Sequence, residues 1–361
     1  MSAQPPLTGR SVAVARSLLA ALLVLLSGTR PSASEPLNAL VPATVEVPST
    51  LRTTPFARDR VLMIPRGFKI SVLARIPAAR FIMPLSTGEI LVAQPATGRI
   101  LVVRPQADGT VGVSTLISRL RYPQGMALYH SDDKLYLYVG ESKQVSRFTI
   151  AHDAASEGDQ TVIVPNLPDS SSPELGGFYR HVLKNLVIGP DKKLYVDIAP
   201  ATNANPKDTT SNPVRSAIYQ YDLDGSNAKI FARGIRNAEG VAFVPGTKEL
   251  WAAVNETDDV RYPFRNSWQD SEVPERFRNG VALALHGSWD RSRKTGYKVI
   301  FFPWKEGRPG RQIDLVTGWL DDRSQRQWGR PVDVKPANDG SLLISDDYSG
   351  TIYRLAPLRG R

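Results

Sequence analysis

The chain has 361 residues, of which 42% are hydrophobic and 22% charged, a composition typical of a folded protein with a hydrophobic core rather than of a disordered chain. It contains no cysteine, which excludes disulfide bonds, thiol nucleophiles and cysteine-ligated metal sites. Lysine and arginine (45) outnumber aspartate and glutamate (35), giving a net charge of +10, and the four histidines are too few for a histidine-rich metal site.

The first 34 residues have the features of a secretory signal peptide. They contain no acidic residue, Arg10 and Arg16 precede the apolar run 17–26, and the small residues before position 35 offer a cleavage site near Ser34. The run is short for a membrane-spanning helix, although an uncleaved anchor is the alternative. We therefore predict a periplasmic or secreted protein with no stable membrane anchor after cleavage.

The positive charge does not indicate a nucleic-acid partner. Cleavage removes three arginines, which lowers the net charge from +10 to +7, and the remaining basic residues are scattered along the chain. The one basic cluster, at positions 291–294, is typical of a solvated loop, and no stripe of lysine or arginine with interleaved aromatic residues occurs.

A tight turn followed by a short apolar strand recurs along the rest of the chain. Glycine, asparagine and aspartate supply the turn, and β-branched and aromatic residues supply the strand. After most copies comes a loop and a second strand with an alternating pattern, and no helical periodicity is sustained. The six copies are at residues 86–92, 131–139, 189–196, 245–251, 278–284 and 338–344.

This repeat predicts an all-β fold, a six-bladed β-propeller over residues 61–358. Six units leave about 50 residues each, the size of a four-stranded antiparallel blade. A pair of β-sandwiches is the alternative. We expect residues 68–73 to complete the last blade beside residues 351–355, which closes the ring. Residues 35–60, rich in proline, serine and threonine, are expected to be an extended lead-in without strands, and polar loops are expected at 151–180, 199–214, 257–279 and 303–327.

Polar residues lie just outside several apolar strands, where a propeller would direct them to its central channel. Each one alone is equally consistent with a turn or with packing between blades, so the argument depends on their joint placement. They are His181, Arg236-Asn237, Asn255-Glu256, His286 to Trp289, Trp328 to Arg330, and Asp346-Asp347.

The motifs around these residues resemble the soluble glucose/sorbosone dehydrogenases, and they do so in order over residues 61–356. The matching runs are HVLKNLVIGPDKKLYV (181–196), AIYQYDLDGSNA (217–228), GIRNAEG (234–240), LWAAVNE (250–256), HGSWDR (286–291) with TGYK (295–298), and WGRPV (328–332). The resemblance implies a six-bladed propeller that uses pyrroloquinoline quinone (PQQ) with calcium. It also implies a small sugar substrate, an aldose or a sugar aldehyde, and a respiratory electron acceptor such as a quinone or a cytochrome.

The resemblance also implies roles for individual residues. His181 matches the general base that takes the proton of the sugar hydroxyl, and Arg236 matches the arginine that stabilises the developing quinone oxyanion. The other matches are to cofactor-binding residues, Asn237, Asn255, Arg291, Trp328 and Arg330, and to calcium contacts, Asn255 and Glu256. Guanidinium groups suit this cofactor because they bind carboxylates in a bidentate manner, and PQQ is a tricarboxylate.

Two departures from the family pattern keep other functions open. Tyr179-Arg180 stands where the family has Gly-Gly or an acid before the histidine, and Asp290 stands where it often has asparagine. One alternative is a calcium-dependent propeller lactonase, whose cage would draw on Asn203, Asn205, Asn255 and Glu256. The other alternative is a propeller without catalytic activity that binds a partner protein.

Overall fold

The computed structural model divides into two compact units, residues 1–36 and Leu37–Arg361, and every described residue belongs to the second. The structure describes residues 39–131, 134–150, 160–169, 181–182, 184–202, 205–244, 246–255, 277, 280–288, 291–305 and 308–358. In these residues the regular structure is β-strand, with three short 3-10 helices, η1 (Ser49–Leu51), η2 (Pro95–Thr97) and η4 (Pro206–Thr210). No helix in the described part of the chain is long and apolar enough to span a membrane.

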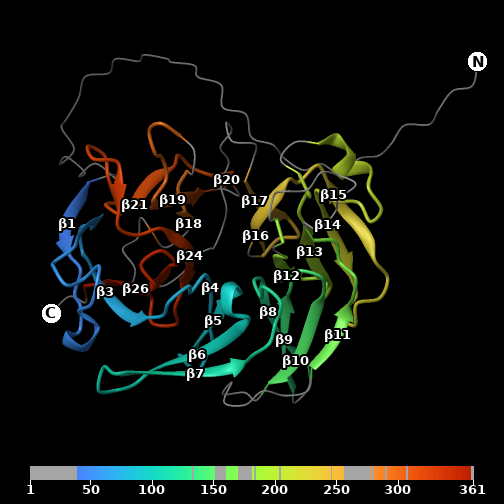
Figure 1. The fold of residues 1–361 in the computed structure, drawn as a ribbon, viewed down its shortest axis with the longest axis horizontal. Coiled ribbons are helices and arrows are strands. Elements are labelled where there is room, and N and C mark those ends of the chain that lie inside the picture. The colour runs from blue at the N-terminus through green and yellow to red at the C-terminus, as the bar shows by residue number, and fades with distance from the viewer. Residues whose placement is uncertain are drawn as a thin grey trace, which may run out of the picture. The chain divides into compact units, whose positions relative to one another are not determined.

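The strands form antiparallel sheets arranged around a centre, as a β-propeller (Figure 1). The first sheet consists of β4 (Phe81–Pro84), β5 (Ile90–Gln94), β6 (Arg99–Pro105) and β7 (Val111–Ile117). The second consists of β8 (Met126–Ser131), β9 (Lys134–Gly140), β10 (Val145–Ile150) and β11 (Gln160–Val164). The third consists of β12 (Leu186–Ile188), β13 (Leu194–Ile198), β14 (Ala217–Tyr221) and β15 (Lys229–Arg233).

The remaining sheets complete the arrangement. β16 (Asn237–Phe243) pairs with β17 (Leu250–Asn255). β18 (Gly280–Leu285) pairs with β19 (Lys298–Lys305), which in turn pairs with both β20 (Arg308–Pro309) and β21 (Ile313–Val316). A small hairpin of β22 (Leu320–Asp321) and β23 (Arg326–Gln327) follows. The last sheet contains β24 (Pro331–Pro336), β25 (Leu342–Asp346), β26 (Thr351–Pro357) and β3 (Phe68–Arg75).

The expected closure of the ring is confirmed, but the expected number of blades is not. β3 pairs with β26 along its length, so an N-terminal strand completes the last sheet. The described residues form five four-stranded sheets rather than six, because β16 and β17 pair only with each other there. The next copy of the repeat, β18, pairs forward with β19 and not back with β17.

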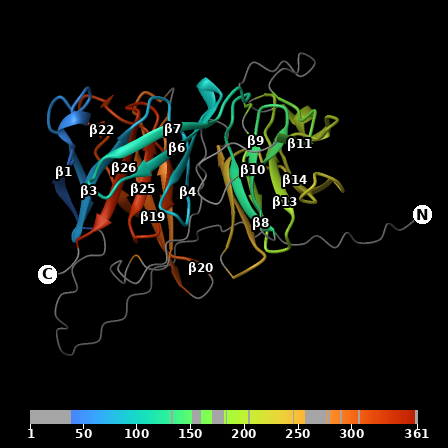
Figure 2. The same ribbon diagram turned by 90° about the horizontal axis from the view of Figure 1, so that it is seen from below.

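Three segments expected to lack strands contain them: 35–60, 303–327, and 151–180, which contains β11. In the segment 35–60, β1 (Leu40–Thr44) pairs with β2 (Val61–Pro65), and Met63 of β2 bridges to Thr317 after β21. Glu46 then forms a parallel bridge with Ser71 of β3, so this segment connects two neighbouring sheets. Figure 2 shows β1 at the same edge as β3 and β26. The segment 303–327 contains β20 to β23, whose short lengths hide the alternating pattern.

Buried apolar side chains form layers between neighbouring sheets, as expected when strands with buried faces stack radially. One layer joins the first sheet to the second, another joins the second to the third, and a third joins the last sheet to the first. The layers bury the faces of the sheets, and β4, β8, β12, β16, β18 and β24 are the strands nearest the centre (Figure 1).

Close contact between the second and third sheets requires glycine at two positions. A Cβ added to Gly140 would lie 2.1 Å from the carbonyl oxygen of Lys184, and one added to Gly125 would lie 2.7 Å from the same atom. Both distances are shorter than any real Cβ contact, so the backbone of Lys184 would have to move.

Gly140→Ala is therefore expected to destabilise the protein by about 2 kcal/mol, the cost of overpacking a rigid site. Gly112→Ala is the matched control, because Gly112 is also in a strand and its added Cβ would meet nothing closer than 3.8 Å. The free energies of unfolding of both variants, measured in urea, test this prediction. Equal stability of the two variants would contradict it.

Candidate active site at the mouth of the central channel

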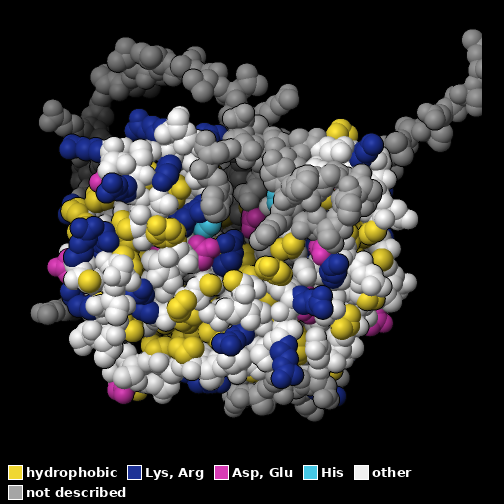
Figure 3. Space-filling model, in the orientation of Figure 1, with side chains coloured by type: hydrophobic (Ala, Val, Ile, Leu, Met, Phe, Trp, Pro, Cys, Tyr) yellow, Lys and Arg dark blue, Asp and Glu magenta, His cyan; other side chains and the backbone are white. Residues whose placement is uncertain are grey.

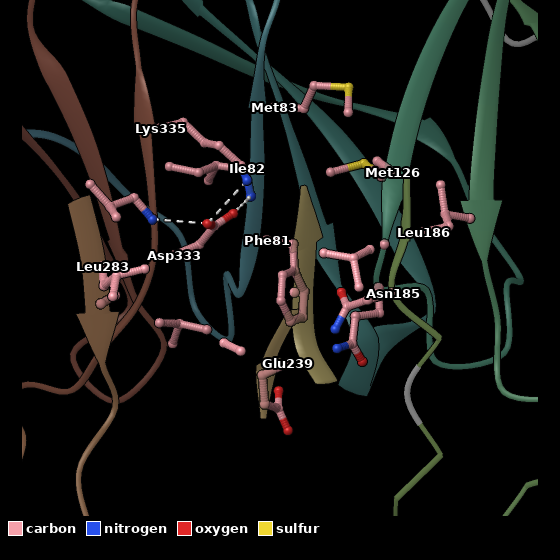
Figure 4. Close-up of a pocket in the computed structure, with 18 of the residues that line it drawn as sticks. Phe81, Ile82, Met83, Met126, Asn185, Leu186, Glu239, Leu283, Asp333 and Lys335 are labelled. Atoms are coloured by element: carbon pink, nitrogen blue, oxygen red, sulfur yellow. Dashed lines mark hydrogen bonds and ion pairs between the residues drawn. The ribbon is translucent and has the colours of Figure 1, made fainter. Parts of the chain in front are cut away.

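The centre of the propeller is a channel lined by the innermost strand of each sheet around it. Its lining includes residues of β4, β8, β12, β16, β18 and β24, and it encloses a cavity of about 160 Å³. Figure 4 shows Phe81, Asn185 and Glu239 toward one end of this pocket, and Met83, Met126 and Lys335 toward the other. The polar residues that precede β4, β12, β16 and β24 therefore lie at one mouth of the channel. Figure 3 shows a hollow near the centre of one face, with histidine, acidic and basic side chains at its rim.

His181 lies at this mouth with one ring nitrogen fixed. Its Nδ1 is 3.0 Å from the carbonyl oxygen of Pro200, which can only accept a hydrogen bond, so the proton is on Nδ1 and Nε2 has the lone pair. Burial lowers the pKa of His181, and the positive charge of Arg236 lowers it further, while the bond to Pro200 and the charges of Glu239 and Asp208 oppose this shift. The imidazole is therefore neutral at pH 7.

The structure brings Arg236 and Asn237 to the same side of the mouth as His181. Arg236 is close enough to influence the pKa of His181, and Asn237, 4% exposed, begins β16. The amide of Asn237 donates a hydrogen bond of 2.9 Å to the carboxylate of Glu239. Glu239 lines the channel, so it adds one negative charge beside the imidazole and the guanidinium.

A second histidine is held by an aspartate at the other side of the mouth. Nε2 of His286, after β18, is 2.9 Å from Oδ1 of Asp347, and Nη1 of Arg80 is 2.5 Å from Oδ2. Burial alone would raise the pKa of Asp347, but the hydrogen bond from His286 and the charges of His286, Arg80 and Arg330 hold that pKa below its usual value. This arrangement fixes the orientation of the His286 ring.

Arg330 holds the loop that contains His286. Its Nε and Nη2 donate to the carbonyl oxygens of His286 and Gly287 at 3.1 and 2.9 Å, and its guanidinium lies 5.4 Å from the centre of the Tyr297 ring. Its backbone N–H donates to Asp346 at 2.9 Å. Arg330 is 6% exposed, so its described contacts are with the protein rather than with solvent.

The other predicted cofactor residues are placed differently or lie outside the described part. The ring of Trp328 packs against Phe56 and Trp319, with Arg60 above it, so its contacts lie in the hydrophobic cluster beneath β1 and β2. Arg291 is half-buried in the loop after His286. Glu256, Arg180, Asn203, Trp289 and Asp290 lie outside the described residues, as does the side chain of Asn255, although its backbone ends β17.

Sequence reasoning missed Arg80 and Glu239 and gave no role to Asp347. Arg80 directly precedes the first apolar strand of the first sheet, which is the same position rule that selected Arg236 and Arg330. Glu239 lies inside β16, where the register shift between Ala238 and Gly240 changes the alternation of the side chains. No sequence pattern shows that shift.

The donor groups at the mouth suit a planar anionic cofactor better than a metal held by side chains. Arg80, Arg236 and the two imidazoles supply positive or hydrogen-bonding groups, and Nε of Arg80 is buried with no hydrogen-bond partner in the described part. Gln124 lines the same pocket, is 0% exposed, and neither of its amide atoms has a partner among the described residues. Those residues contain no group of three histidine or acidic side chains that could hold a metal ion. Among the described residues alone, a calcium ion here would find backbone carbonyls rather than a cluster of acidic side chains.

Comparison with known proteins gives a consistent result. Residues 62–276 match the family model described as TrAA12-like. An uncharacterised protein of Borreliella burgdorferi is 23% identical, over 81% of this chain and 90% of that protein. The calcium structure of a family AA12 carbohydrate-active enzyme from Trichoderma reesei is 17% identical with a TM-score of 0.65, over 82% of this chain and 97% of that one.

Two further solved structures share the fold. The holo form of the PQQ domain of pyranose dehydrogenase from Coprinopsis cinerea is 15% identical with a TM-score of 0.62, over 82% of this chain and 97% of that one. The PQQ-bound aldose sugar dehydrogenase from Streptomyces coelicolor is 17% identical with a TM-score of 0.52, over 81% and 99%. At these identities the structures establish the fold, and the family rests on the match over residues 62–276.

Proposed function

Because this chain belongs to the TrAA12-like family of PQQ-dependent oxidoreductases, we propose that it is a PQQ-dependent sugar dehydrogenase. Its substrate is an aldose or a sugar aldehyde of the glucose or sorbosone type. One observation carries the proposal: at one mouth of the channel a neutral imidazole, His181, lies within electrostatic reach of a guanidinium, Arg236. That pair supplies a proton acceptor and a fixed positive charge for the oxidation of an alcohol.

His181 takes the proton of the sugar hydroxyl in this proposal. The Nδ1–H bond to Pro200 fixes the tautomer, so Nε2 is the basic atom, and the lowered pKa keeps that atom unprotonated at neutral pH. After it has accepted the proton, the imidazolium is stabilised by the carboxylates of Glu239 and Asp208, whose charges raise its pKa. PQQ, when bound, supplies the hydride acceptor.

The cofactor would be held by residues on both sides of the mouth. Arg236 and Asn237 lie on one side and Arg80 on the other, and the family resemblance adds Arg330, Arg291 and Trp328. Arg330 would act by holding the His286 loop, because its described hydrogen bonds are with that loop and with Asp346. Asn255 and Glu256 stay the proposed calcium contacts.

His286 is a second candidate for the base, and the Asp347 contact favours it. A carboxylate bonded to one ring nitrogen orients an imidazole and stabilises its protonated form, as in other catalytic histidines. In this alternative Asp347 is shared, because its second oxygen is bonded to Arg80. His286 bonds Asp347 through Nε2, which leaves its Nδ1 as the basic atom. The proposal assigns the proton to His181 because the charge of Arg236, which would stabilise the developing oxyanion, acts on His181.

Reconstitution tests the function directly. The apoprotein is titrated with PQQ and calcium, and dye reduction is assayed with a panel of aldoses and sugar aldehydes. Sugar-dependent reduction that requires PQQ supports the proposal. Hydrolysis of lactones without PQQ would favour the lactonase, and activity in neither assay would favour a binding propeller.

Export and electron transfer are part of the same proposal. A signal peptide over residues 1–34 would place the enzyme in the periplasm or outside the cell, where its electrons pass to a respiratory quinone or cytochrome. N-terminal sequencing of the exported protein tests the cleavage near Ser34, and a mature protein that still begins at Met1 would contradict it.

The charge of Arg236 has a measurable effect on His181. Arg236→Met is expected to raise the pKa of His181 toward 6.5, because that positive charge opposes protonation of the ring. Histidine NMR of the apoprotein measures this pKa without any contribution from the cofactor. Arg233→Met, which removes an exposed guanidinium three residues earlier, is the control and is expected to leave the pKa unchanged. A fall of the pKa in Arg236→Met would contradict the prediction.

A further inference from the structure

The turn between β25 and β26 carries an exposed aromatic side chain at the mouth of the channel. Tyr348 is 58% exposed, whereas the next two residues of the turn, Ser349 and Gly350, are buried. The turn lies at the mouth because the end of β25 pairs with the start of β24, directly after Arg330. Turns usually contain glycine, proline, asparagine, aspartate or serine, so the turn itself does not explain a tyrosine that faces solvent.

The backbone that follows Tyr348 is fixed by hydrogen bonds. The N–H and the hydroxyl of Ser349 donate to the buried carboxylate of Asp346 at 2.9 and 2.7 Å. The carbonyl oxygen of Ser349 accepts a hydrogen bond of 3.0 Å from Nη2 of Arg75, at the end of β3. The turn therefore keeps Tyr348 in one place while leaving its ring in contact with solvent.

The residue before Tyr348 connects the turn to the second histidine of the mouth. Asp347 accepts hydrogen bonds from Nε2 of His286 at 2.9 Å and from Nη1 of Arg80 at 2.5 Å. Because a carboxylate only accepts, the proton of the neutral ring is on Nε2 and the lone pair is on Nδ1. The side chain of His286 is 26% exposed, so its ring is partly accessible to a ligand. Its Nδ1 can accept a hydrogen bond from a ligand hydroxyl.

An exposed aromatic ring and a nearby hydrogen-bond acceptor suit a sugar. The C–H groups on one face of a pyranose ring pack against an aromatic ring, and the hydroxyls at its edge donate hydrogen bonds. The carboxylate of Asp347 is already bonded to two basic side chains, so a neutral ligand fits this side of the mouth better than an ion.

Single exposed aromatic residues are common on protein surfaces, and Phe231 is one of them. It is 45% exposed on β15, the outermost strand of the third sheet. Tyr348 differs from Phe231 because it follows a fixed turn, lies at the mouth and is next to the aspartate that holds His286. These features together point to a ligand.

Tyr348 and His286 lie on the opposite side of the mouth from His181. His181 is bonded to Pro200, after β13 of the third sheet, and is close to Arg236, whereas Tyr348 follows β25 of the last sheet. In the proposed function the sugar unit that is oxidised lies at His181. The ring of Tyr348 is therefore available to another part of the substrate.

We propose that Tyr348 and Nδ1 of His286 form a subsite for the glycosyl unit attached to the oxidised sugar, so that the substrate is a reducing oligosaccharide rather than a monosaccharide. The inference rests on the proposed function for the position of the oxidised unit. In this subsite Tyr348 is a specificity-determining residue: its ring packs against the second sugar, and the imidazole accepts a hydrogen bond from one of its hydroxyls.

The first test measures binding to the apoprotein, so it depends on neither the cofactor nor turnover. Dissociation constants for glucose, cellobiose, maltose and lactose are measured by NMR titration. At least one disaccharide is expected to bind more tightly than glucose, and Tyr348→Ala is expected to raise its dissociation constant about tenfold, the size of one lost aromatic contact. Tyr348→Phe, which keeps the ring, is expected to stay within about twofold of the wild type. Phe231→Ala is the control for an exposed aromatic residue away from the mouth and is expected to behave as the wild type.

The second test uses the enzyme loaded with PQQ and calcium. The ratio of kcat/KM for that disaccharide to kcat/KM for glucose is expected to fall about tenfold in Tyr348→Ala, through a higher KM for the disaccharide. Tyr348→Phe and Phe231→Ala are expected to keep the ratio of the wild type. A merely structural tyrosine would lower both values by the same factor and leave their ratio unchanged.

The outcomes separate this inference from the proposed function. The inference is overturned if no disaccharide binds more tightly than glucose, or if Tyr348→Ala binds the disaccharide as tightly as the wild type, even when sugars are oxidised. An unchanged ratio of kcat/KM in Tyr348→Ala also overturns it. Disaccharide binding that requires the ring supports the subsite even if no sugar is oxidised, in which case the proposed function fails alone.

Discussion

His181→Ala is expected to lower kcat for sugar oxidation about 10³-fold, while the protein is expected still to bind PQQ. The expected size follows from the loss of a positioned general base, which contributes roughly 10²- to 10⁴-fold in enzymes. Cofactor binding is expected to survive because guanidinium groups, rather than the imidazole, are assigned to the PQQ carboxylates. An absorbance titration with PQQ measures binding, and dye reduction measures kcat in the same samples.

Two other histidines make this experiment decisive. His130→Ala removes an exposed histidine of β8 and is expected to leave kcat unchanged. His286→Asn removes the partner of Asp347 and is expected to cost less than His181→Ala. A loss of about 10³-fold in His286→Asn, with smaller loss in His181→Ala, would transfer the role of base to His286.

Asp346→Ala is expected to destabilise the protein by about 4 kcal/mol, the largest effect on stability that we predict. Its carboxylate is 0% exposed and accepts from the N–H groups of Arg330 and Ser349 at 2.9 Å, from the hydroxyl of Ser349 at 2.7 Å and from that of Tyr353 at 3.2 Å. Alanine would remove the carboxylate from four buried donors, of which the Ser349 hydroxyl can still donate to the Thr351 hydroxyl, at about 1 kcal/mol or more for each lost bond. Urea unfolding measures the difference.

A matched variant and a second readout test the reason for this loss. Asp224→Ala removes an exposed turn aspartate that caps Ser226 and is expected to cost less than about 1 kcal/mol. Because Asp346 also holds the backbone of Arg330, we expect Asp346→Ala to disturb the NMR signal of the His286 ring as well. A destabilised protein with an unchanged His286 signal would contradict the expected link between Asp346, in the last sheet, and the His286 loop at the mouth of the channel.

The propeller was predictable because its repeat is local. Turn residues such as Asp339 and Gly340 and the strand that follows them appear in the sequence without any long-range information, and Gly340 has the positive φ of 77° that such a turn needs. The pairing of β3 with β26 followed from an apolar strand that had no repeat of its own. The count of five four-stranded sheets was not predictable, because whether β18 pairs with β17 or with β19 depends on tertiary contacts.

The candidate site was predictable in part for a similar reason. His181, Arg236 and Arg330 were predicted to be site residues because each lies just outside an apolar strand. The fold brings His181 and Arg236 close to each other. The same rule did not predict that Arg330 donates hydrogen bonds to the backbone of the His286 loop, or that Trp328 packs beneath β1. Both contacts depend on side-chain packing between distant segments. The burial of Lys184 has no sequence signal at all, because lysine is normally expected to be exposed.

The pairing of β3 with β26 also determines when the protein can finish folding. Residues 68–75 and 351–357 lie at opposite ends of the repeat, so the last ladder of hydrogen bonds joins segments separated by almost 300 residues. During synthesis, the edge of β3 that pairs with β26 has no partner strand until β26 has been made. The ring therefore stays open for most of the synthesis of the chain, and it closes only when the final strand has been made.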